Sequence, residues 1–161
     1  MNANNYRTNQ LIILVILRVI IGWHFLYEGL IKLFNPNWTS VGYLIDSEGL
    51  FSGVFQSMAA NPGLMQVIDF LNIWGLILIG AGLLLGIFSK FAAYAGMFLL
   101  AFYYLSHPPL IGTQYAVPSE GNYLIVNKNL IEFFTLWVLA IFPTSFIIGL
   151  DRLVFRKQAI K

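Results

Sequence analysis

Four apolar segments run along this chain, and each is close to the length that crosses a lipid bilayer. They cover residues about 11–34, 64–88, 91–106 and 130–150. A helix needs about 20 residues to cross about 30 Å of hydrocarbon. The chain has 161 residues, of which 58% are hydrophobic and only 10% are charged. These features predict an all-α integral membrane protein, a single domain over residues 1–161 built as a bundle of four transmembrane helices.

The first apolar segment carries four ionisable residues, Arg18, His24, Glu28 and Lys32. At about 100° per residue they fall within a stripe about 120° wide on one face of a helix. An ionisable group near the bilayer centre costs on the order of 3 kcal/mol. Four such groups on one face therefore indicate a polar interior, a water-filled cleft or a binding site. The segment lacks a small-residue cleavage site, so we expect it to be retained as a helix.

The Lys and Arg residues predict the orientation of the helices. They lie mainly before the first segment, between the second and third, and in the C-terminal tail: Arg7, Lys90, Arg152, Arg156, Lys157 and Lys161. Cytoplasmic loops of membrane proteins carry the excess of such residues. Both termini are therefore predicted to be cytoplasmic, in a multi-pass protein of the inner (cytoplasmic) membrane of a prokaryote. The net charge of +2 reflects this topology and not binding to nucleic acid.

The loop over residues 35–62 would then lie outside, as would the loop over residues 107–127. The first of these is too long for a simple connection and contains aromatic and aliphatic residues among Gly and Ser. It predicts a short interfacial or re-entrant helix that caps the bundle. In the second apolar segment, Gly75, Gly82 and Gly86 fall within about 40° of one another, which predicts close helix packing.

In this topology, polar residues from all four helices reach the outer half of the bundle. Besides His24, Glu28 and Lys32 of the first helix, they are Asp69, Asn72, Tyr103, Tyr104, His107, Lys128, Asn129 and Glu132. The inner half is predicted to have only Arg18 within the membrane. One interpretation is a network of ion pairs that fixes helix register, since the first-helix residues form an i,i+4 ladder. The other is a ligand site, which we favour because so many polar side chains exceed what register requires.

His24 is the residue best suited to proton transfer, and Glu28 one turn away can orient it or accept its proton. Arg18, Lys32 and Lys128 can receive an anion or a quinone carbonyl. The two histidines have no ligand-like spacing, so no metal or haem site is predicted. The chain has no cysteine, which excludes disulfides, thiolate metal sites and Cys-ligated iron–sulfur clusters within it.

The sequence resembles the DoxX/DoxD family of membrane proteins. The resemblance runs over residues 17–153 and is carried by the segments 17–33, 38–44, 69–76, 103–109, 127–132 and 149–153. It implies the DoxD-type membrane subunit of a thiosulfate:quinone oxidoreductase, which acts with a second redox subunit. Thiosulfate would be oxidised to tetrathionate on the outer side, and a membrane quinone would accept the electrons.

Two other functions remain open at this point. One is a transporter or binding protein for a small molecule or ion, and the other is a non-catalytic partner that assembles other membrane proteins. The exposed helix faces and the Gly82/Gly86 pair permit a homodimer without requiring one.

Overall fold

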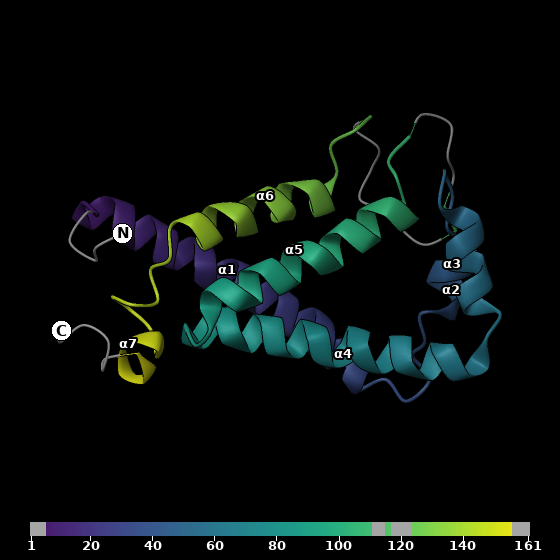
Figure 1. The fold of residues 1–161 in the computed structure, drawn as a ribbon, viewed down its shortest axis with the longest axis horizontal. Helices are drawn as coiled ribbons and strands as arrows, with labels where there is room; N and C mark the ends of the chain where they lie inside the picture. The colour runs from purple at the N-terminus through teal and green to yellow at the C-terminus, as the bar shows by residue number, and fades with distance from the viewer. Residues whose placement is uncertain (1–5, 111–114, 117–123, 156–161) are drawn as a thin grey trace.

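A computed structural model describes residues 6–110, 115–116 and 124–155 of the chain (Figure 1). Within those ranges the protein has only helices and no strand, which confirms the predicted all-α class. The helices are α1 (Thr8–Leu33), α2 (Val41–Ile45), α3 (Ser52–Ala59), α4 (Pro62–Leu85), α5 (Ser89–Ser106), α6 (Lys128–Ile141) and α7 (Asp151–Val154). Three of the basic residues used to predict topology, Arg156, Lys157 and Lys161, lie outside this description.

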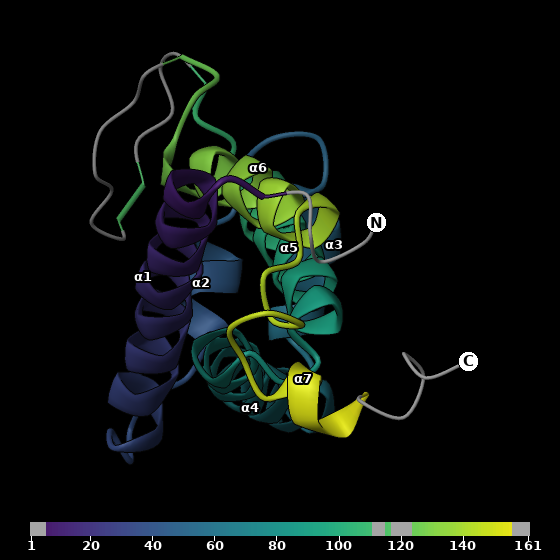
Figure 2. The same ribbon diagram turned by 90° about the vertical axis from the view of Figure 1, so that its left-hand side faces the viewer.

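Among the residues that the structure describes, helices α1 and α4 are the two that are long and apolar enough to cross a membrane. They have 26 and 24 residues, and the most apolar window of each has a mean hydropathy of 2.0. These two helices make the most extensive helix–helix contact in the fold, and α5 packs with α6 as a second pair (Figures 1 and 2). With 18 and 14 residues, α5 and α6 rise only about 27 and 21 Å.

The fourth predicted segment is helical only in its first part. α6 ends at Ile141, whereas the sequence analysis expected a helix as far as residue 150. Pro143 follows closely, and a proline removes a backbone donor and disfavours helical geometry in the residue before it. Phe142 accordingly has φ −111° and ψ 68°. Residues 142–150 instead return toward the turn between α4 and α5, where the backbone N–H of Leu150 donates to the carbonyl of Leu85 at 3.1 Å.

The turn between α4 and α5 is short, as predicted, and a distant residue completes it. Gly86 ends α4 in the left-handed region, with φ +62°. The carboxylate of Asp151 then accepts hydrogen bonds from the backbone N–H groups of Phe88 (2.7 Å) and Ser89 (3.3 Å) at the start of α5. A negative side chain suits the unpaired N–H groups of a helix N-terminus. Residues 142–155, here called the C-terminal segment, thereby join the α5–α6 pair of helices to the α1–α4 pair.

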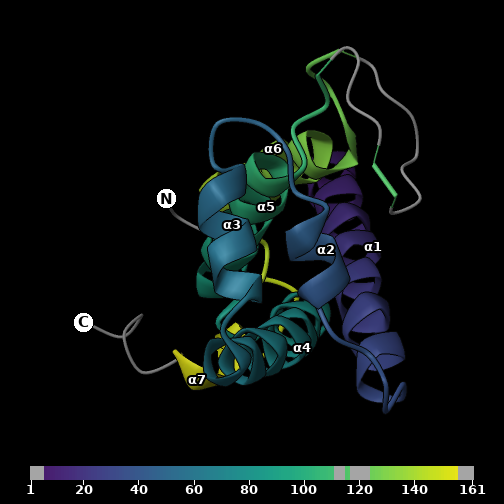
Figure 3. The same ribbon diagram turned by 90° about the vertical axis from the view of Figure 1, so that its right-hand side faces the viewer.

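Two short helices, not one, occupy the predicted 35–62 loop. α2 and α3 close one end of the molecule, here called the loop end (Figure 3). The start of α1 and all of α7 lie at the opposite end, here called the terminal end (Figure 1). Asp69 of α4 fixes the start of α2 by accepting from the backbone N–H of Ser40 at 2.9 Å and from the Thr39 hydroxyl at 2.8 Å. A small apolar cluster of Leu44, Phe55 and Met65 lies beneath these helices.

Glycines set the close approach of α1 and α4. A Cβ at Gly80 would lie 2.7 Å from the carbonyl oxygen of Gly22 and would also meet the backbone of Leu26. The glycines predicted to pack together behave differently from one another: Gly75 faces open space, and Gly82 packs near Ala92 of α5. The observed packing seam therefore lies on another face of α4, where only a residue without a side chain fits.

We expect Gly80→Ala to destabilise the protein while Gly75→Ala does not. The added methyl at position 80 would push α1 and α4 apart, at a cost of about 1–3 kcal/mol. At position 75 it meets nothing, and alanine favours the helix by about 1 kcal/mol over glycine. Thermal unfolding of both variants in the same detergent checks this. Equal melting temperatures for the two would contradict the described seam.

Candidate functional site

The stripe of ionisable residues on α1 reaches three different surroundings. His24 faces α6, where its Nε2 lies 3.2 Å from Oε1 of Glu132. The side chain of His24 is 30% exposed and that of Glu132 is 12% exposed. The His24–Glu132 contact links the α1–α4 pair of helices to the α5–α6 pair, since α1 and α6 otherwise make few contacts. Glu28, the middle member of the predicted i,i+4 ladder, is half-buried. It interacts electrostatically with Lys32, the next member.

Lys32 belongs to a hydrogen-bonded chain that crosses three helices at the loop end. Its Nζ donates to Oδ1 of Asn72 on α4 at 3.1 Å, and Nδ2 of Asn72 donates to the Tyr103 hydroxyl of α5 at 2.6 Å. The Lys32 ammonium also lies 5.1 Å from the ring centroid of Trp38 and 5.7 Å from that of Tyr103. Cations are attracted to aromatic faces at such distances. The Tyr103 hydroxyl, having accepted, keeps a proton to donate.

His107 lies in an aromatic stack just beyond α5. Its ring stacks on Tyr43 of α2 with the centroids 3.8 Å apart and lies 4.5 Å from the ring of Tyr115. Nε2 of His107 is 3.7 Å from Oδ2 of Asp46, which suits an ion pair but is too long for a hydrogen bond. Burial lowers the pKa of His107 below its ordinary value of 6.5, and Asp46 offsets part of this shift. The neutral ring is therefore favoured in the folded protein.

Tyr43 links the same stack to the Lys32 chain. Burial raises the pKa of its hydroxyl, so the hydroxyl stays protonated. It donates to the backbone carbonyl of Tyr103 at 3.2 Å. The loop-end helices are thus held directly over the residues that surround Lys32.

The remaining predicted residues at the loop end hold local structure. Asp69 fixes the start of α2, as described above, and the Tyr104 hydroxyl donates to the backbone carbonyl of Ile125 at 2.8 Å. Lys128 and Asn129 are half-buried in the first turn of α6. Asn127, which the site prediction did not include, caps that helix by accepting from the N–H of Leu130 at 3.0 Å.

Arg18 does not join the loop-end residues. It is buried toward the terminal end, where Nη1 donates to the Thr144 hydroxyl at 2.8 Å and Nη2 donates to the carbonyl of Ile148 at 2.6 Å. Asp151 is close enough to interact with it electrostatically. The sequence predicts an inner half that is apolar apart from Arg18. That prediction does not include Thr144 or Asp151, because Thr144 falls within the helix expected to continue to residue 150 and Asp151 within the tail beyond it.

An open groove separates α1 from α6, and its walls are almost wholly apolar. It has a volume of about 500 Å³ and is lined by Leu17, Val126, Leu130, Ile131, Phe134, Thr135 and Val138. Leu130 and Ile131 directly precede Glu132 in the chain, and Leu17 lies seven residues before His24 on the same face of α1. The groove and the His24–Glu132 pair therefore share helices α1 and α6, although neither member of the pair lines the groove. No spacing in the sequence signals it, because it arises from how far apart two helices pack.

Among models of protein families, the one described as DoxX matches residues 13–108, which is more than half of the chain and covers most of α1 and all of α4 and α5. No curated protein and no solved structure matches.

We expect the stability conferred by the His107 stack to fall as the pH falls below 6.5. The pKa of His107 is lower in the folded than in the unfolded state, so between the two values the unfolded protein binds more protons. The contribution of His107 to stability is therefore fully present above pH 6.5 and is lost as the pH falls through its folded pKa. The slope reaches at most about 1.4 kcal/mol per pH unit. Melting temperatures between pH 7.5 and 5.0 measure it. His107→Gln keeps His24 and should flatten the profile; identical profiles would contradict the described environment of His107.

Proposed function

The chain belongs to the DoxX family of membrane proteins, and from that premise we propose that it binds a membrane quinone as a subunit of a quinone-linked oxidoreductase. The observation that carries the proposal is that the same two helices, α1 and α6, carry both the His24–Glu132 pair and an apolar groove. Together they offer a proton-carrying head site and an apolar channel for a hydrocarbon tail. These are the two features that an isoprenoid quinone requires of a protein.

The proton chemistry of quinone reduction suits the pair. A quinone takes up two electrons and two protons to become a quinol. Histidine titrates near neutral pH, and a carboxylate at 3.2 Å can pass a proton to it or take one away. Because His24 is partly exposed, a ring placed in the groove would reach it from the hydrocarbon side. Glu28, one turn further along α1, is proposed as the next proton carrier toward the loop end.

The Lys32 chain is proposed as the site for an anionic electron donor. Lys32, Asn72 and Tyr103 present a cation and two polar side chains to one place, and an anion accepts hydrogen bonds from such groups. By family resemblance the donor is thiosulfate: two thiosulfate dianions give one tetrathionate dianion and two electrons. Those electrons and two protons reduce one quinone. The chain has no cysteine, so we propose that a second redox subunit carries the electrons between the two sites.

In this proposal all four of the longer helices lie in the bilayer. α1 and α4 cross it fully, and α5 and α6 extend their span with the segments that flank them. The terminal end, with Arg7, Lys90 and Arg152, faces the cytoplasm, in keeping with the excess of basic residues on that side of membrane proteins. The loop end, with the Lys32 chain, then faces the outside of the cytoplasmic membrane.

We expect Glu132→Gln and His24→Ala each to weaken quinone binding at least tenfold, which corresponds to about 1.4 kcal/mol. Binding of a long-tailed ubiquinone and of menaquinone to the protein in nanodiscs is measured by quenching of tryptophan fluorescence. Leu130→Trp should also weaken binding because the larger side chain fills the groove. Leu78→Trp is the matched control, since Leu78 is 66% exposed on α4, away from the groove.

The same preparations separate the possible outcomes. Unchanged affinity in Glu132→Gln and His24→Ala would exclude this quinone site. Binding that depends on these residues, followed by quinone reduction with thiosulfate once the partner subunit is added, would support both proposed sites. Loss of that reduction in Asn72→Leu, with quinone affinity retained, would assign the Lys32 chain to the donor.

A further inference from the structure

Two exposed basic residues, Lys90 and Arg152, each follow a member of the buried, hydrogen-bonded pair Ser89 and Asp151 at the terminal end. Asp151 accepts hydrogen bonds from the backbone N–H and the hydroxyl of Ser89, at 3.3 and 3.4 Å. Lys90 directly follows Ser89, and Arg152 directly follows Asp151; the side chains of both basic residues are exposed. Asp151 itself is only 2% exposed, so it offers no negative charge to the surface. The surface at this point is therefore cationic.

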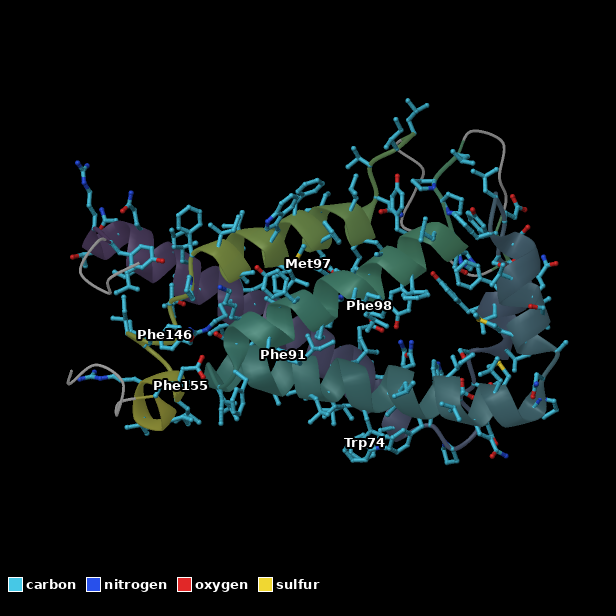
Figure 4. The ribbon with its side chains drawn as sticks, in the orientation of Figure 1. Trp74, Phe91, Met97, Phe98, Phe146 and Phe155 are labelled. Atoms are coloured by element: carbon cyan, nitrogen blue, oxygen red, sulfur yellow. The ribbon has the colours of Figure 1, made fainter. Side chains whose placement is uncertain are left out.

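The chain segments that carry these cations also carry three exposed aromatic rings, those of Phe88, Phe146 and Phe155. The Phe155 ring meets those of Phe88 and Phe146 edge to face, with centroids 5.9 and 6.0 Å apart. Phe88 is 57% exposed, Phe146 43% and Phe155 36%. Figure 4 shows Phe146 and Phe155 together at the terminal end, beside α7. Aromatic rings adjoining cations at the end of a membrane bundle are typical of the interface between acyl chains and headgroups.

Hydrogen bonds and close packing hold the C-terminal segment, which carries Phe146, Arg152 and Phe155, against the α4–α5 turn, which carries Phe88 and Lys90. Arg18 holds the C-terminal segment through Thr144 and the carbonyl of Ile148, and the Asp151 N–H donates to the carbonyl of Gly86 at 2.8 Å. Gly149 also lies in close contact with the α4–α5 turn, where an added Cβ would be 3.0 Å from the Gly86 carbonyl oxygen. The backbone that carries Arg152 and the rings is therefore held in place before any ligand arrives, which reduces the entropy cost of binding.

We propose that this surface binds an anionic phospholipid, with Lys90 and Arg152 on its phosphate and the three phenylalanines against the beginning of its acyl chains. The positive charge selects an anionic over a zwitterionic headgroup, and the rings select a lipid over a free phosphate ion. This inference needs the protein to lie in a membrane, and it does not depend on the proposed binding of quinone.

The test compares phosphatidylglycerol with phosphatidylcholine. We expect native mass spectrometry of the detergent-solubilised protein to show at least tenfold preferential retention of phosphatidylglycerol, and we expect the doubly substituted Lys90→Gln, Arg152→Gln protein to lose that preference. Lys128→Gln removes one charge at the loop end and should leave the preference unchanged. Equal retention of the two lipids by the wild type, or an unchanged preference in the double variant, would overturn the proposal.

Two further experiments distinguish binding of a whole lipid from binding of a free phosphate ion. Phe146→Ala with Phe155→Ala should reduce retention of phosphatidylglycerol several-fold while leaving both cations in place. Inorganic phosphate at millimolar concentration should not displace the lipid. Displacement by phosphate together with full retention by the double phenylalanine variant would assign the surface to a free anion and overturn the lipid assignment.

Discussion

The arrangement of the protein depends on how closely α1 approaches α4. With Gly22 facing Gly80, the two backbones come within reach of each other, and the rotation of α1 about its axis is fixed. That rotation decides what each polar residue of α1 can reach. Lys32 is turned toward Asn72 on α4, Arg18 toward the C-terminal segment, and His24 toward α6. One steric requirement thus distributes a single stripe of charge among three different partners.

Much of this distribution follows from rules that act locally, and the rest does not. The stripe on α1 and its polar character are visible in the spacing of the ionisable residues. The end of α6 at Ile141 could also have been read from Pro143, because proline constrains the residue before it. The cap that Asp151 places on α5 could not, because it joins residues 62 positions apart. Nor could the α1–α6 groove, which depends on the distance between two helices.

The loop-end residues show why a list of polar side chains overstates a site. Of the residues expected to gather there, Asp69 accepts a hydrogen bond from the backbone of Ser40, and Tyr104 donates one to the backbone of Ile125. These two side chains hold the loops in place. Lys32, Asn72 and Tyr103 instead form a connected chain through the centre of that end. His24 and Glu132 stand apart from this chain and form a separate pair between α1 and α6. Composition and depth predict a region rich in polar side chains, but only hydrogen-bond partners separate residues that could serve a ligand from residues that serve the fold.

The Asp151 cap also orders the events of biosynthesis. A ribosome makes α1, α4 and α5 before it makes residue 151, so the N–H groups at the start of α5 lack this acceptor while the first helices enter the membrane. The glycine-lined pair of α1 and α4 needs nothing made later, whereas the attachment to the α4–α5 turn must wait until residue 151 has been made. A chain shortened before Asp151 would leave its third long helix without its N-terminal cap.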